Sequence, residues 1–158
     1  MVYSKILAAL DQSALRGDVF EQALAMAKLN QGQLMLFHCI PLEQTVLTPY
    51  PSIYSEEMAN FSRVIHERLQ QQTEETQQWL ADYGSRAEQQ GIRTEWDWKI
   101  GEPSRHICDL AKTWEADLIV LGRRGLQGLA EIFLGSVSNY VVHHARCSVL
   151  LVQQPKPE

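Results

Sequence analysis

The residues best suited to chemistry lie in a glycine-rich stretch of this chain. Gly122 and Gly125 are separated by two residues, and nine residues further on come Gly135 and Ser136. Glycines permit positive φ angles and a close approach of main chain to a ligand. Consecutive N–H groups in such a loop form an anion-binding nest, and a helix beginning at Ser136 adds unpaired N–H groups and the positive end of its dipole. The stretch predicts a main-chain polyphosphate site, while a strand-to-helix turn that only needs glycines is the alternative.

Two arginines in this stretch, Arg123 and Arg124, are candidate phosphate ligands. A solvated loop arginine is the commoner outcome, and neither residue belongs to the glycine–serine pattern. We retain Arg124 among the candidate binding residues. The sequence contains neither a Walker A motif nor the glycine fingerprint of dinucleotide-binding folds.

Five apolar runs predict the strands that position this loop. Between them lie helical patterns, over Ser13–Asn30, over Ser55–Gln90, from Glu102-Pro103 and from near Ser136. Ser13 is expected to cap the first helix, and Gly32 to follow its end. Alternating strands and helices predict an α/β fold with a parallel sheet and right-handed crossovers. The predicted strands are Lys5–Leu10, Gln33–Ile40, Ile92–Ile100, Ala116–Gly122 and Cys147–Val152.

One of these strands is expected at an edge of the sheet. Apolar and charged residues alternate along Ile92–Ile100, which indicates one buried and one wet face. Trp96 and Trp98 are expected in the core rather than as a stacking platform for nucleic acid, because acidic residues surround them. Cys147–Val152 is apolar on both faces, and if the topology places it at the other edge something must cover it, because an apolar open edge invites pairing. A homodimer formed through this last strand is therefore our hypothesis.

Composition narrows the class of protein. The 158 residues suit one domain, residues 1–154, with a short tail at 155–158, and 14 basic against 19 acidic side chains give a net charge of -5. This charge argues against nucleic acid as the main partner. The first apolar stretch ends at Leu10, too short for a membrane span and without the layout of a signal peptide, so we expect no membrane partner and a cytoplasmic protein.

The three cysteines, Cys39, Cys108 and Cys147, are widely spaced and form no CxxC pair. This spacing favours buried, inert thiols over a disulfide framework or a zinc site. His38 and Cys39 are adjacent on a strand and point to opposite faces, so they cannot chelate one metal ion. We therefore expect no metal centre built from protein side chains.

Taken in order, these segments resemble the universal stress protein family. Gly122-x2-Gly125-x9-Gly135-Ser136 is similar to the G-x2-G-x9-G-S/T signature of its ATP-binding members. Residues 5–13 resemble the first strand and the acidic residue that ends it, and residues 36–40 resemble the second strand. The resemblance continues through residues 101–107, 116–122 and 147–152, and so spans nearly the whole chain. It implies a single-domain, open five-stranded parallel sheet of order 3-2-1-4-5 with helices on both faces, of the adenine-nucleotide α-hydrolase-like type.

The resemblance also implies roles for individual residues. Asp11 is expected to meet the ribose or adenine side of a nucleotide, and the main chain of Cys39 to hold adenine. The remaining candidates are expected along the ribose and the phosphates; they are Gly122, Gly125, Gly135, Ser136, Val137 and Ser138. The expected cofactor is ATP, or AMP or ADP, with Mg²⁺ or Mn²⁺ held by the phosphates. In this family the last strand often pairs antiparallel with a second subunit.

Three functional hypotheses follow. The first is an ATP-binding regulatory or sensor protein of the stress response, with an unknown protein partner and at most slow hydrolysis, because no dedicated general base is recognisable. The second is a genuine ATP-hydrolysing enzyme, against which stands the absence of a serine- and glycine-rich loop after the first strand. The third is an interaction module of the same family that does not bind nucleotide, against which stand the intact glycines and Ser136.

Overall fold

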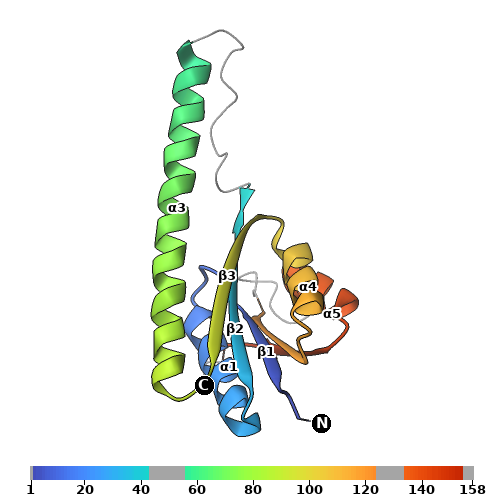
Figure 1. Ribbon diagram of the computed structural model, residues 1–158. Helices are drawn as coiled ribbons and strands as arrows, with labels where there is room; N and C mark the ends of the chain where they lie inside the picture. The colour runs from blue at the N-terminus through green and yellow to red at the C-terminus, as the bar shows by residue number, and fades with distance from the viewer. Residues whose placement is uncertain (1, 43–55, 124–133, 155–158) are drawn as a thin grey trace.

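The computed structural model describes residues 2–42, 56–123 and 134–154. Strands and helices alternate along these parts of the chain, as the sequence predicts (Figure 1). Their bounds are β1 Lys5–Ala9, α1 Arg16–Asn30, β2 Gln33–Pro41, α3 Glu56–Gln89, β3 Thr94–Gly101, α4 Pro103–Thr113, β4 Leu118–Gly122, α5 Ser136–His144 and β5 Ser148–Val152.

The strands form one parallel sheet in the order β3-β2-β1-β4-β5, which confirms the predicted topology. β1 is central, and its Leu7 lies opposite Met35 on β2 and Ile119 on β4. The chain leaves β1 toward β2 on one side and reaches β4 on the other. The carboxyl ends of β1 and β4 therefore border the point where the strand order reverses, which is where open α/β sheets bind ligands.

Two hydrophobic clusters, one on each face, hold the helices against the sheet. Ile6 and Ala8 of β1 face α1 and α3, whereas Leu7 and Ala9 face α4 and α5. Figure 1 shows these two helical layers on opposite sides of the strands. The central strands are buried on both faces because each face is covered by helices, and this explains their continuous apolar runs.

The start of α1 differs from the prediction, whereas its end at Asn30, shortly before Gly32, agrees with it. The residue preceding the helix is Leu15, and Ser13 lies two residues before Leu15, where its hydroxyl accepts a hydrogen bond from the Leu15 N–H at 3.2 Å. At the other end Gln31, not Gly32, takes the left-handed conformation, with φ 52°. A side chain on Gly32 would place its Cβ only 2.6 Å from the carbonyl oxygen of Tyr3. Glycine is needed at position 32 because the chain passes close to the segment that leads into β1.

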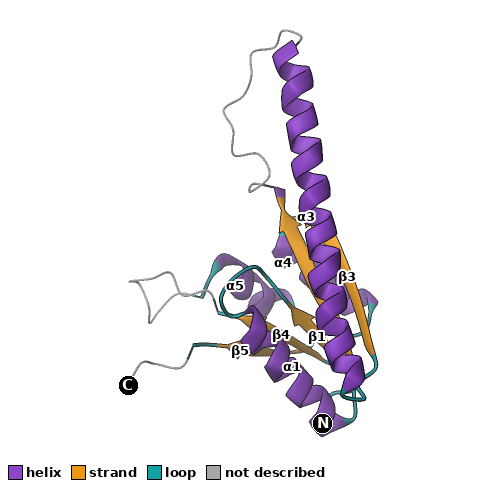
Figure 2. Cartoon of the chain, turned by 90° about the vertical axis from the view of Figure 1, so that its left-hand side faces the viewer, coloured by secondary structure: helices purple, strands orange, loops and turns teal. Residues whose placement is uncertain are grey.

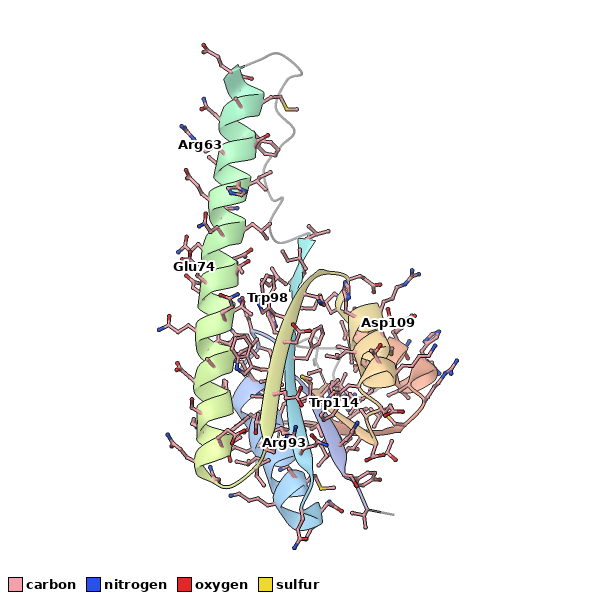
Figure 3. All side chains as sticks on the ribbon, viewed as in Figure 1. Arg63, Glu74, Arg93, Trp98, Asp109 and Trp114 are labelled. Atoms are coloured by element: carbon pink, nitrogen blue, oxygen red, sulfur yellow. The ribbon has the colours of Figure 1, made fainter. Side chains whose placement is uncertain are left out.

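α3 is 34 residues long and extends well beyond the sheet (Figures 1 and 2). Its buried residues, Thr76, Leu80, Gly84 and Ala87, all belong to its second half. The first half is largely exposed, and Figure 3 shows Arg63 on this projecting part. The described parts of the chain contain no helix long and apolar enough to cross a membrane.

The predicted edge strands lie at the two edges of the sheet. β3 pairs with β2, and its Trp98 packs against the cluster between the sheet, α1 and α3. The expectation that Trp96 also lies in the core is wrong, because this side chain is 39% exposed and rests against Gly84 of α3. Trp96 shares the face of Trp98, and it stays partly in contact with water because β3 has a neighbouring strand on one side only. β5 lies at the other edge beside β4, and its Val149, Leu150 and Leu151 are only partly buried.

Candidate functional site

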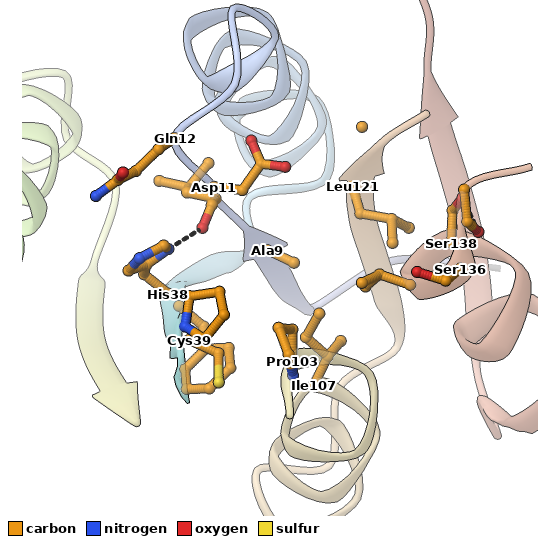
Figure 4. Close-up of a pocket in the computed structure, with 16 residues that line it drawn as sticks. Ala9, Asp11, Gln12, His38, Cys39, Pro103, Ile107, Leu121, Ser136 and Ser138 are labelled. Carbon is orange, nitrogen blue, oxygen red and sulfur yellow. Dashed lines mark hydrogen bonds between the residues drawn. The ribbon is translucent and has the colours of Figure 1, made fainter. Parts of the chain in front are cut away.

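A cavity of about 230 Å³ opens at the carboxyl ends of β1, β2 and β4 (Figure 4). It lies at the reversal point of the strand order, between the first turns of α4 and α5. Its lining combines apolar side chains with the polar groups at the ends of strands and helices. The lining residues are Ala9, Leu10, Asp11, Gln12, Phe37, His38, Cys39, Pro41, Pro103, Ile107, Leu121, Gly122, Gly135, Ser136, Val137 and Ser138.

One side of this cavity is apolar. Phe37 from β2, Leu121 from β4 and Ile107 from α4 are all buried in the cluster beneath α4 and α5. Pro103, the first residue of α4, stands at the same wall, where its fixed φ angle suits a helix start (Figure 4). A flat, apolar ring system fits such a wall better than a charged group does.

Cys39 belongs to the apolar side and is 6% exposed. Burial, with a smaller contribution from the carboxylate of Glu102, raises the pKa of its thiol to about 11. Burial also raises the pKa of the Cys108 and Cys147 thiols, which are partly buried. The predicted inert character of all three cysteines therefore has a physical basis, since the thiolate is the reactive form.

This raised pKa predicts slow alkylation of Cys39. At pH 8 its thiolate fraction is on the order of 100-fold below that of a cysteine with the ordinary pKa of 9.0. Iodoacetamide labelling followed by peptide mass spectrometry is expected to modify Cys39 last, with a rate rising about tenfold per pH unit up to about pH 11. Because the folded state holds this proton more tightly than the unfolded state, stability is expected to fall as the pH rises from 9 toward 11. Rapid labelling of Cys39 in the native protein at pH 7 would contradict this account.

The polar side of the cavity begins with Asp11, which follows the end of β1. Its Oδ1 accepts a hydrogen bond from the main-chain N–H of Ser13 at 2.9 Å, which closes a turn typical of aspartate. The carboxylate is only partly buried and lines the cavity together with Gln12 (Figure 4). The turn therefore presents an anionic acceptor beside the apolar wall.

The first turn of α5 forms the opposite polar wall. Gly135 precedes the helix, and its carbonyl oxygen accepts from the Asn139 N–H at 2.9 Å, the first hydrogen bond of the helix. The Ser138 hydroxyl donates to the same carbonyl at 3.1 Å, so its one hydrogen is engaged within the protein. Ser136 is exposed. The N–H groups of the first turn have no partner inside the helix, and they carry the positive end of its dipole.

Gly122 and Gly135 play a different conformational role from the expected one. Gly135 has φ −58°, and Gly122 is not among the described residues with positive φ. A Cβ on Gly122 would lie 3.3 Å from the Leu15 side chain and 3.4 Å from that of Val19. Gly122 is therefore small because α1 packs against the end of β4. The positive-φ part of our expectation is wrong for both glycines.

The structure brings most of the predicted site residues to this one cavity. Those that line it are Asp11, Cys39, Gly122, Gly135, Ser136, Val137 and Ser138. Arg124 and Gly125 lie outside the described residues. His38, Phe37, Ile107 and Leu121 were not predicted as site residues. Of these only His38 gives a signal in the sequence, as the single polar side chain in an otherwise apolar run.

The sequence model of the universal stress protein family matches residues 2–153. The chain belongs to this family. It is 52% identical over 153 residues to universal stress protein Sll1388 of Synechocystis sp., covering 97% of this chain and 99% of that protein. It is 31% identical over 154 residues to universal stress protein YxiE of Bacillus subtilis, covering 96% of this chain and 100% of that protein.

Solved structures share the fold at lower identity. The structure of hypothetical protein MJ0577 has a TM-score of 0.81 at 23% identity and covers 99% of this chain and 100% of its own. A universal stress protein in complex with cAMP has a TM-score of 0.62 at 21% identity, covering 96% of this chain and 98% of that one. An Arabidopsis thaliana family protein with AMP bound has a TM-score of 0.57 at 19% identity, covering 96% and 92%. Together with the strand order, these similarities show the adenine-nucleotide α-hydrolase-like fold.

Residues 2–42, 56–123 and 134–154 contain no group of three or more His, Cys, Asp or Glu side chains that could hold a metal ion. Within the described lining of the cavity, Asp11 is the one carboxylate.

Proposed function

We propose that this protein binds an adenine nucleotide, ATP in the first place, in the cavity at the carboxyl ends of β1 and β4, and that it acts as a nucleotide-dependent regulatory protein in the stress response. The observation that carries the proposal is the composition of the cavity. An apolar wall, a carboxylate and the first turn of a helix meet around one space. The apolar wall suits a base, the carboxylate suits a ribose, and the first turn of the helix suits a phosphate chain.

The apolar wall is the proposed site of the base. Phe37, Ile107 and Leu121 offer contacts to a flat ring, and the main chain at Cys39 offers hydrogen-bonding groups at its edge. Because Cys39 is protonated over the physiological pH range, its thiol has no charge to contribute. Recognition there is therefore assigned to the main chain.

The first turn of α5 is the proposed site of the phosphates. Ser136 and Val137 line the cavity, and their N–H groups and the Ser136 hydroxyl are proposed to donate to phosphate oxygens. The Ser138 hydroxyl is assigned to holding Gly135, because it donates to the carbonyl of that residue. Arg124 and Gly125 remain proposed phosphate contacts.

Proteins of the same fold support the choice of adenine. The related structures include universal stress proteins bound to cAMP, AMP and dAMP. These ligands share an adenine base, a ribose-type sugar and one phosphate, so they favour an adenine site here. Preference for ATP over the monophosphates is our inference from the glycine–serine stretch of residues 122–136, which resembles the signature of ATP-binding members of the family.

Regulation, rather than fast turnover, is the proposed outcome of binding. The one carboxylate of the described lining, Asp11, already holds the Ser13 N–H. A single carboxylate makes a poor metal site, so Mg²⁺ or Mn²⁺ would be held mainly by phosphate oxygens. Hydrolysis of ATP is accordingly expected to be slow at most.

Dimerisation through β5 remains part of the proposal. This strand forms an edge of the sheet, and its apolar residues Val149, Leu150 and Leu151 are only partly buried. Pairing with β5 of a second copy would satisfy the open main-chain groups and cover these side chains. Light scattering at micromolar concentration is expected to give the mass of a dimer, and the mass of a monomer would contradict this part of the proposal.

The experiment that tests the proposed function is a comparison of melting temperatures in millimolar ATP, AMP, cAMP and GTP. A nucleotide present at 100 times its Kd stabilises the native state by about 2.7 kcal/mol, which corresponds to a rise of roughly 5–10 °C for a domain of this size. We expect this rise with adenine nucleotides, largest with ATP, and a smaller one with GTP. An unchanged melting temperature in all four nucleotides would contradict the proposal.

A further inference from the structure

We propose that His38 is a positioning residue for the nucleotide site, in that it holds the main chain at Leu10 and thereby fixes the turn that carries Asp11. The inference rests on the proposed nucleotide site and adds to it a residue that does not have to touch the ligand. His38 is 3% exposed and lies near the end of β2, where its neighbours in residues 34–41 are all apolar. A buried polar side chain costs free energy unless it is hydrogen-bonded, so its presence here calls for a reason.

The reason lies in the contact between His38 and Leu10. The His38 Nδ1 is 2.7 Å from the carbonyl oxygen of Leu10, a contact drawn as a dashed line in Figure 4. A carbonyl oxygen can only accept, so Nδ1 carries the proton and donates it. On the other side of the same residue, the Leu10 N–H donates to the carbonyl oxygen of Phe37 at 2.8 Å. Consecutive residues of β2 therefore hold both main-chain polar groups of Leu10, one residue beyond the end of β1.

This double contact determines the position of Asp11. The carbonyl group of Leu10 and the nitrogen of Asp11 belong to one planar peptide unit, so fixing the carbonyl also fixes the plane from which Asp11 departs. Asp11 in turn holds the Ser13 N–H at 2.9 Å. The geometry thus forms a chain of contacts from β2, through Leu10, to the carboxylate at the cavity.

The imidazole ring is itself held in place. Trp79 of α3 meets it edge-on, with ring centroids 5.1 Å apart and an interplanar angle of 65°. The guanidinium of Arg16 lies over Trp79, 4.4 Å from its ring centroid, and Tyr83 packs against Trp79 at 6.1 Å. A residue at position 38 must therefore fill the volume of a ring against Trp79 and also place a donor at the Nδ1 position, and histidine meets both demands.

Two substitutions separate these demands. His38→Phe keeps the ring and removes the donor, whereas His38→Asn places an amide N–H near the position of Nδ1. Titration calorimetry with ATP and Mg²⁺ is expected to show a roughly tenfold higher Kd for His38→Phe, the loss typical of one buried hydrogen bond, and a Kd for His38→Asn within about threefold of the wild type. Thr76→Val, which alters another fully buried polar side chain outside the cavity lining, is the control and is expected to leave the Kd unchanged.

Amide NMR spectra without nucleotide supply a readout that does not depend on binding. We expect the signals of Gln12 and Ser13 to shift in His38→Phe and to return toward their wild-type positions in His38→Asn. A wild-type Kd in a folded His38→Phe variant, or unshifted Gln12 and Ser13 signals, would overturn the positioning role. If the wild type itself binds no ATP, the proposed function fails, and the NMR comparison still decides whether His38 holds the turn.

Discussion

Replacing Gly135 by valine is expected to weaken ATP binding by at least about 100-fold while the protein stays folded. Gly135 has φ −58° and ψ 160°, a conformation that valine adopts without strain, so the main chain need not change. Gly135 lines the cavity, so a branched side chain at this residue is expected to occupy space beside the first turn of α5. It would keep phosphates away from the N–H groups of Ser136 and Val137. Removal of contacts to the charged phosphates accounts for a loss of about 3 kcal/mol or more, which is the 100-fold change.

Gly17→Val is the matched control for this variant. It adds the same side chain at a glycine of α1, where nothing lies within 4 Å of the new Cβ. The Kd of Gly17→Val is expected to equal that of the wild type. Calorimetric titration gives both constants, and circular dichroism shows whether each variant is folded. If a folded Gly135→Val protein bound ATP like the wild type, the phosphates could not bind beside the first turn of α5.

Replacing Asp11 by alanine is expected to weaken ATP binding by about 10- to 100-fold and to destabilise the protein by about 1 kcal/mol. The loss of affinity follows from the removal of the one carboxylate in the described cavity lining, which the proposed function assigns to the ribose hydroxyls. The loss of stability follows from the removal of the acceptor for the Ser13 N–H. Titration calorimetry and urea unfolding measure the two effects separately.

Asp11→Asn divides these two roles. Its amide oxygen can still accept from the Ser13 N–H, so stability is expected to stay within a few tenths of a kcal/mol of the wild type. Its charge is lost, so the Kd is expected to rise, although less than in Asp11→Ala. Equal affinity in all three proteins would show that the carboxylate does not contact the ligand.

The sheet could be predicted because its strands are buried in different ways. Continuous apolar runs mark strands covered by helices on both faces, and the alternation along residues 92–100 marks an edge. These patterns depend only on which side chains are buried, and the distribution of apolar and charged residues along the sequence indicates burial directly. The strand order 3-2-1-4-5 came instead from the resemblance to a family, and the structure confirms it.

The details of the site depended on contacts between residues far apart in the sequence. The reason for Gly122 is its contact with Leu15 and Val19 of α1, more than a hundred residues earlier, rather than a positive φ angle. Ser138 has the right residue type for a phosphate contact, yet its hydroxyl donates to Gly135. Trp96 is partly exposed because it sits on the edge strand against Gly84. Each of these outcomes depends on which atoms surround a residue in the folded protein. A pattern along the sequence does not identify those atoms.

His38 is another residue whose contacts could be predicted only in part from the sequence. Its adjacency to Cys39 indicates that the two side chains point to opposite faces, and the structure places His38 beside Trp79 and Cys39 beneath α4. That argument excludes a shared metal ion, but it does not identify the Leu10 carbonyl as the partner of Nδ1. The partner follows only from the parallel pairing of β1 with β2.

The central claim, an adenine-nucleotide site at the carboxyl ends of β1 and β4, is tested most directly by equilibrium titration of the nucleotide-free protein with ATP and Mg²⁺. We predict one site per chain with a Kd on the order of micromolar, about −8 kcal/mol of binding free energy, competition by AMP, and at least about 100-fold weaker binding to Gly135→Val. Absence of binding to the wild type at millimolar ATP would contradict the claim and favour an interaction module that works without nucleotide.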